Sequence, residues 1–172
     1  MALVKISRGA DIKHEYTNGV SRVPILEGAY KDAKVERISL QPGADLTPET
    51  YSKTEHNQVF LVTAGKGYIV TPRRVYNITE VSVFVPDFDK ESFTFHCAAD
   101  AKETMEIVHF VTELSDYDKT CLKEAHLTLP RFRGVSQAWH YKEDFTGADI
   151  QQMMMIEHRN LGRLSMGANF GT

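Results

Sequence analysis

The chain has 172 residues, of which 42% are hydrophobic and 25% charged, with a formal net charge of −3. This length and composition are typical of one compact domain with a substantial core. The 20 basic and 23 acidic residues are spread along the chain, so we expect neither a nucleic acid nor an anionic membrane as a partner.

The N-terminus and the cysteines predict a cytoplasmic location. No apolar run approaches the roughly 18 residues that span a bilayer, and the first residues turn polar too soon for a secretory signal. Cys97 and Cys121 form no C-x-x-C pair, and a chain of this length needs no disulfide for its stability. We therefore expect both thiols to be reduced.

Between about Val35 and Leu114 the sequence is typical of short β-strands separated by turns. The expected strands are rich in Val, Ile, Phe and Tyr, and they show no helical periodicity. They cover residues 35–40, 58–63, 67–71, 81–86, 92–97 and 105–111. Pro42-Gly43 and Gly65-Lys66-Gly67 are the clearest turns. This pattern predicts an all-β sandwich or barrel.

Residues 114–151 differ in character, because they are polar, contain turn signals and show only local periodicity. We expect a connector that wraps over the barrel, with a helical turn near Asp118 to Glu124. The residues after it predict one more pair of strands. The expected division is therefore a barrel at 1–115 and a connector with C-terminal strands at 116–172.

Two stretches carry a family resemblance, HNQVFLVTAGKGYIV at 56–70 and EVSVFVPDFDKESFTFHC at 80–97. Their spacing resembles the paired motifs of the cupin superfamily. Gln58 stands where the family has a Glu before Gly65, and counting from Pro86 places Glu91 where it has a His. The resemblance implies the cupin double-stranded β-helix, an RmlC-like antiparallel jelly-roll barrel, here with a C-terminal connector and extra strands.

The residue types at these positions argue against the metal site that the resemblance would otherwise imply. Cupin metals are held by imidazoles and a carboxylate that converge inside the barrel. Counting back from Gln58 puts Ser52 and Thr54, or Tyr51 and Lys53, in place of the His-x-His pair. Hydroxyl and amide groups are weak ligands for such ions. We therefore expect a degenerate metal site and no cofactor, beyond at most a weakly bound divalent metal.

Strand alternation predicts three polar side chains on the inner side of the barrel. His56 has the parity of Gln58, and Glu91 has that of Phe93. An imidazole near a carboxylate can act as general acid and base, so His56 and Glu91 are the candidate catalytic residues. The candidate ligand-binding residues are Gln58, Tyr51, Thr54, Ser52 and Arg73.

Simpler roles stay open for the same side chains. His56 can lie in the loop before the strand, and Gln58 can merely satisfy hydrogen bonds of the barrel. Glu91 inside a barrel would need a partner, either His56 or Arg73. Arg73 and Arg74 can instead form an exposed hairpin edge.

Parity also sorts the remaining residues of the strands. It places Phe60, Val62, Phe93 and Phe84 close to the core. Single histidines on strands are usually packed or solvated, so we expect no site at His96 or His109. The histidines of the connector and tail, His126, His140 and His158, lack the spacing of metal ligands, so we expect no metal site there.

The segment IEHRNLGRLSMGANFGT at 156–172 resembles the opening strands of another cupin domain. The whole chain thus resembles the metal-free N-terminal barrel of a bicupin, and its tail is either the start of a second barrel or a pair of exchanged strands. We expect Met153, Met155, Leu161 and Leu164 to be buried against a barrel, because they would otherwise form an apolar patch. Unpaired strands favour association, so we expect a homodimer.

Two functions follow from these residues. The first is a structural, dimerising or small-polar-ligand-binding barrel. The alternative is a metal-independent or weakly metal-dependent enzyme of isomerase or lyase type, which acts on a sugar or organic acid with His56, Gln58 and Glu91. In either case the expected partner is a small polar metabolite.

Overall fold

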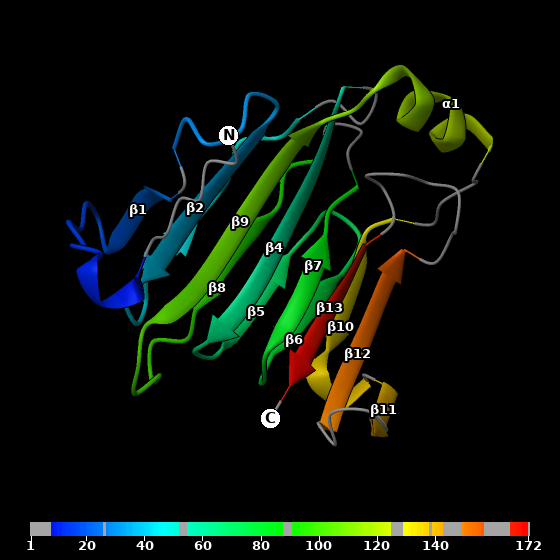
Figure 1. The fold of residues 1–172 in the computed structure, drawn as a ribbon. Helices are drawn as coiled ribbons and strands as arrows, with labels where there is room; N and C mark the ends of the chain where they lie inside the picture. Colours follow the sequence, from blue (N-terminus) through cyan, green and yellow to red (C-terminus); the bar gives the residue numbers. More distant parts are fainter. Residues whose placement is uncertain are drawn as a thin grey trace.

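The computed structural model describes residues 8–25, 27–51, 55–87, 91–124, 129–137, 139–142, 149–156 and 166–171 (Figure 1). Within these ranges the chain forms thirteen β-strands, one α-helix and two short 3-10 helices. The strands pair antiparallel and form three sheets. The expected all-β, antiparallel architecture is confirmed.

The first sheet has six strands in the order β1-β2-β9-β4-β7-β10. They are β1 Val20–Ile25, β2 Ala33–Leu40, β9 Met105–Glu113, β4 His56–Ala64, β7 Ser82–Val85 and β10 Arg131–Gly134. Apart from β1 and β2, neighbours in this sheet are not consecutive in the chain, so side chains from distant parts of the sequence meet on its inner face.

The second sheet has four strands in the order β3-β8-β5-β6, with β3 at Asp45–Leu46, β8 at Thr94–Cys97, β5 at Gly67–Val70 and β6 at Val75–Ile78. A third sheet joins β11 Trp139–Lys142, β12 Asp149–Ile156 and β13 Met166–Gly171, and β12 contacts β10 of the first sheet. The helical elements are α1 Asp116–Glu124, η1 Gly9–Asp11 and η2 Val135–Gln137.

The core lies between the first two sheets and is centred on four phenylalanines. The ring centroids of Phe60, Phe84, Phe93 and Phe95 lie 5.0 to 6.4 Å apart in every pairing. Each of these side chains is at most 3% exposed, and Val62 is 1% exposed. The predicted core residues are therefore buried as expected, and aromatic packing fills this part of the barrel.

Gly65 allows the chain to leave the first sheet and enter the second. Its φ is +88°, a left-handed conformation that glycine adopts without strain. A Cβ at this position would lie 2.5 Å from the Cα of Met105. The turn predicted at Gly65-Lys66-Gly67 is present, between the end of β4 and the start of β5.

Several strands were not predicted, and β10 is the most informative. It lies in the expected connector, yet Phe132 pairs with Phe84 of β7 and packs partly buried against the core. A stretch that reads Arg-Phe-Arg-Gly offers one apolar residue, which is too few for a strand pattern. The expected helical turn is present as α1.

The tail forms the expected strand pair, because β12 and β13 run antiparallel. The structure does not describe the side chains of Met153 and Met155, and Leu161 and Leu164 lie outside the described residues. Their burial therefore stays a prediction. Cys97 and Cys121 are not joined in a disulfide, as expected. In the part of the chain described here, no helix is long and apolar enough to cross a membrane.

The burial of Phe84 on β7 and the exposure of Phe110 on β9 predict unequal effects of two phenylalanine substitutions. Phe84→Ala should lower the free energy of unfolding by about 3–5 kcal/mol, because Phe84 is fully buried in the aromatic core. Phe110 is 37% exposed, so Phe110→Ala should cost only roughly 1–2 kcal/mol. Urea denaturation of both variants measures the difference, and equal losses would contradict the assigned faces.

Candidate functional site

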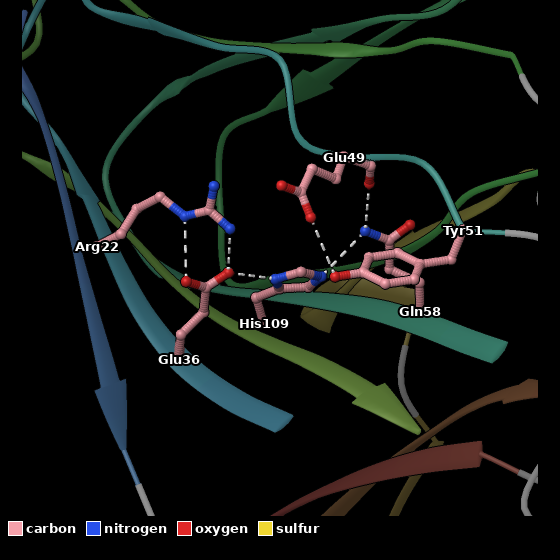
Figure 2. Close-up of polar contacts among 6 residues, drawn as sticks. All are labelled: Arg22, Glu36, Glu49, Tyr51, Gln58 and His109. Carbon is pink, nitrogen blue, oxygen red and sulfur yellow. Dashed lines mark hydrogen bonds and ion pairs between the residues drawn. The ribbon is translucent and has the colours of Figure 1, made fainter. Parts of the chain in front are cut away.

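A chain of hydrogen bonds crosses four neighbouring strands of the first sheet (Figure 2). Arg22 of β1 donates to both carboxylate oxygens of Glu36 of β2, with Nε to Oε2 at 3.1 Å and Nη2 to Oε1 at 2.7 Å. His109 of β9 lies with its Nδ1 2.6 Å from the same Oε1. Its Nε2 lies 3.0 Å from Nε2 of Gln58 on β4. Gln58 Nε2 also donates to the backbone carbonyl of Glu49 at 2.9 Å.

Strand register places these polar side chains on the inner face. Glu36 and His109 are direct cross-strand partners, and His109 is paired in turn with Phe60. The imidazole is 3% exposed and stacks on the Phe60 ring, with a centroid distance of 4.3 Å and an interplanar angle of 4°. The network thus borders the aromatic core, where an unpaired polar group would be costly.

The network itself indicates the tautomer of His109. A backbone carbonyl can only accept, so the Gln58 atom that faces Glu49 must be the amide nitrogen. The same nitrogen faces His109 Nε2, which therefore accepts a hydrogen bond and carries no proton. The proton of the neutral imidazole lies on Nδ1 and is donated to Glu36. Each link of the chain fixes the direction of the next.

Glu36 is held as a carboxylate. Burial alone would raise its pKa, but hydrogen bonds from His109 and Arg22 outweigh this and lower the pKa from 4.5 to about 2. The hydrogen bond to Glu36 also raises the pKa of Arg22, with smaller contributions from the charges of Glu36 and Glu49. At neutral pH this ion pair is therefore fully ionised.

A pocket of about 430 Å³ opens beside this network. Its walls come from β1, β2, the loop between them, residues 49 and 51, and β9. Arg22, Glu36 and His109 form one wall, and Glu49 and Tyr51 contribute another. Its lining includes both polar and apolar side chains.

Tyr51 and His56 lie near this pocket. The Tyr51 hydroxyl donates to Glu49 Oε2 at 3.3 Å, and burial, followed by the charge of Glu49, raises the pKa of Tyr51. The ring of His56 lies 5.2 Å from the Tyr51 ring. His56 is the first residue of β4 rather than part of the preceding loop. Gln58 is 1% exposed, and it positions Glu49 instead of lining the pocket.

Glu91 and Arg73 lie at a different place. Arg73 Nη2 is 2.8 Å from Glu91 Oε1, and their side chains are 69% and 25% exposed. Glu91 lines a small cavity of about 10 Å³ that contains none of the residues of the main pocket. Within the described ranges, no hydrogen bond or ion pair joins Glu91 to His56 or Gln58.

The expected inward trio of His56, Gln58 and Glu91 is therefore not assembled. Glu91 precedes β8, which begins at Thr94, so the strand parity used to place it does not apply there. The expected exposure of Arg73 at a hairpin edge is confirmed. Ser52 and Thr54 lie outside the described residues, so their assignment as ligand-binding residues stays a prediction.

His109, Glu36 and Arg22 were not predicted as site residues from the sequence. One signal was available, because His109 has the same strand parity as Met105, Ile107 and Val111, which are buried. Glu36 carried no comparable signal. It lies 73 residues before His109, and only the order of β2 and β9 in the sheet brings the two together.

The described residues do not fit the metal that the cupin resemblance implies. A metal needs lone pairs, but Gln58 turns its N–H groups toward Glu49 and His109. The lone pair of His109 Nε2 is already engaged by that amide, and Glu91 is paired with Arg73. Among the described residues, no group of three or more His, Cys, Asp or Glu side chains is arranged to hold a metal ion.

Glu36→Gln should destabilise the protein in a pH-dependent way. The folded-state pKa of about 2 lies below the ordinary value of 4.5, so Glu36 adds stability above pH 4.5 that is lost as pH falls toward 2. This difference corresponds to roughly 3 kcal/mol. Urea denaturation should therefore show a loss of about 2–3 kcal/mol near pH 7 and less than half of that near pH 3. Glu91→Gln, which breaks an exposed pair, should cost about 0–1 kcal/mol.

The hydrogen-bond directions predict a single neutral tautomer of His109. In ¹⁵N NMR spectra at neutral pH, Nδ1 should carry the proton and Nε2 should have the chemical shift of an unprotonated nitrogen. Gln58→Leu removes the donor to Nε2, which should change the Nε2 chemical shift, while Nδ1 should keep its proton because Glu36 still accepts it. A wild-type His109 protonated at Nε2 would contradict the network.

Comparison of the sequence finds no matching protein-family model and no matching curated protein. Solved structures do match. The putative glyoxylate-induced protein from Pseudomonas aeruginosa has a TM-score of 0.62 and 10% identity, and the match covers 83% of this chain but only 51% of that protein. This chain thus corresponds to about half of that protein.

Two smaller structures match over nearly their whole length. KdgF from Halomonas sp. has a TM-score of 0.53 and 12% identity, with 66% of this chain and 97% of that one covered. A predicted oxalate decarboxylase from Thermotoga maritima has a TM-score of 0.53 and 16% identity, with 64% and 100% covered. Identities this low compare folds rather than activities. Together with the antiparallel sheets and the motif spacing, they show that this chain has the cupin fold.

Proposed function

We propose that this chain is a binding barrel that holds a small polar ligand in the pocket beside Arg22. The observation that carries the proposal is the pocket of about 430 Å³ with one wall fixed by the network from Arg22 to Glu49. Ligand pockets commonly have volumes of about 300–1,000 Å³ and a few convergent polar groups. A preformed wall lowers the ordering cost of binding.

The side chains of the network already use their hydrogen-bonding atoms on one another, and this favours binding over acid–base catalysis. Both nitrogens of His109 and both carboxylate oxygens of Glu36 already have partners. A general base needs a lone pair within reach of the substrate. The alternative enzyme, which would use His56, Gln58 and Glu91, lacks support because Glu91 pairs with Arg73 away from the pocket.

The mixed lining suits a small metabolite with both polar and apolar parts. Arg22, Glu49 and Tyr51 supply hydrogen-bonding groups, while Pro24 and Val35 supply apolar surface. Polar groups would fix the orientation of the ligand, and the apolar surface would contribute affinity.

A thermal-shift screen against sugars, organic acids, hydroxy acids, amines and amino acids tests this function. A ligand present at about 100 times its Kd should add roughly 2.7 kcal/mol to the free energy of unfolding and raise Tm. For such a ligand, Tyr51→Phe should weaken binding by about 5- to 10-fold, because a hydroxyl hydrogen bond is worth about 1 kcal/mol.

Tyr68→Phe is the matched control. Tyr68 lies on β5 of the second sheet, is 40% exposed and is not part of the pocket lining. This variant should bind like the wild type. If no class of compound raises Tm, the binding function is wrong, and a structural or dimerising role would be favoured instead.

A further inference from the structure

Arg22 presents a guanidinium group of which only one edge is used. Nε and Nη2 hold Glu36, which fixes the plane of the group. Among the described residues, Nη1 has no hydrogen-bond partner, and the side chain is 40% exposed at the pocket wall. The second edge, formed by Nη1 and the remaining N–H of Nη2, offers two parallel donors. Such an edge matches the two oxygens of a carboxylate.

Glu49 offers the opposite charge in the same pocket. Its backbone carbonyl is held by Gln58, and its carboxylate accepts one hydrogen bond, from the Tyr51 hydroxyl at 3.3 Å. Figure 2 shows Arg22 and the Glu49 carboxylate above the row formed by Glu36 and His109. The charge of Glu49 also acts on Arg22, so the two groups are within electrostatic reach. Glu49 lacks a cationic partner among the described residues.

The charges around the pocket balance. Its lining contains three basic side chains and three carboxylates, which are Arg22, Lys31, Lys34, Glu27, Glu36 and Glu49. Because Arg22 and Glu49 both face the space, a simple anion bound at Arg22 would be repelled by Glu49. A simple cation bound at Glu49 would be repelled by Arg22. A ligand that carries both charges avoids each penalty.

We propose that the ligand is an aliphatic α-amino acid, with its carboxylate on the free edge of Arg22 and its ammonium group on Glu49. This inference rests on the binding function proposed above. The aliphatic side chain would lie against the apolar part of the lining, which includes Pro24, Ile25 and Val35. Neutral His109 would form the floor between the two charges without adding a third.

Four compounds of nearly equal shape separate the two charges. They are L-leucine, (S)-2-hydroxy-4-methylpentanoate, 4-methylpentanoate and 3-methylbutylamine. Isothermal titration of the full chain at neutral pH should show L-leucine binding at least about 10-fold more tightly than each of the other three, since one matched charge contributes about 1.4 kcal/mol or more.

Glu49→Gln tests the ammonium site without disturbing the fold. The Glu49 side chain is exposed, and the link to Gln58 uses only its backbone. The variant should lose about 10-fold or more in affinity for L-leucine and should bind the amino acid and the hydroxy acid equally. Glu91→Gln is the matched control, because Glu91 is a paired carboxylate outside the pocket. All four affinities should stay unchanged in that variant.

Three results would overturn the inference. One is a wild-type protein that binds the hydroxy acid or the simple carboxylate as tightly as L-leucine. Another is Glu49→Gln retaining the preference for the amino acid. The third is a sugar or organic acid that raises Tm in the screen while none of the four compounds binds. This last result would leave the binding function standing, whereas a screen without any ligand would remove both proposals.

Discussion

The structure of the site depends on how a buried imidazole is satisfied. His109 is 3% exposed and stacks on Phe60, so water cannot serve its two nitrogens. Leaving either one unpaired would cost about 1–3 kcal/mol. Glu36 and Gln58 supply the partners, and each must then be positioned in its turn. The hydrogen bonds that satisfy His109 therefore involve residues from the outer strand β1 to the loop after β3.

The direction of these hydrogen bonds links the pocket wall to the core. The acceptor-only carbonyl of Glu49 sets the orientation of the Gln58 amide, and the amide sets the tautomer of His109. Glu36 accepts the remaining proton and holds Arg22. Hydrogen bonds in such a network polarise one another, and leaving a buried member of it unpaired is costly. The loop of Glu49 is therefore anchored to β4 through a side chain rather than through sheet pairing.

The fold could be predicted from the sequence because its signals are local. The β-forming residues of 58–63 and 105–111, and a turn that needs glycine at Gly65, are properties of neighbours in the chain. Some strands could not be predicted in this way. Pro24 interrupts β1, and β3 has two residues, so neither offers a pattern to recognise. Such strands form because the rest of the sheet supplies their partners.

The site could be predicted only in part, because its interactions are not local. Gln58 was found since strand parity and motif spacing both mark it. Glu36 was missed although it makes the stronger contact with His109, since 73 residues separate the two. The order β1-β2-β9-β4 decides which side chains meet, and no short motif contains that order.

Glu36 and Glu91 show that surroundings decide what a carboxylate does. Both pair with an arginine, at 2.7 Å and 2.8 Å. Glu91 meets Arg73, whose side chain is 69% exposed, and exposed pairs of this kind contribute about 0–1 kcal/mol. Glu36 also accepts from buried His109, and its pKa falls to about 2. Glu91 is the residue that the cupin motif spacing marks. Of these two carboxylates, however, it is Glu36 whose burial and contact with the His109 imidazole give its charge a structural role.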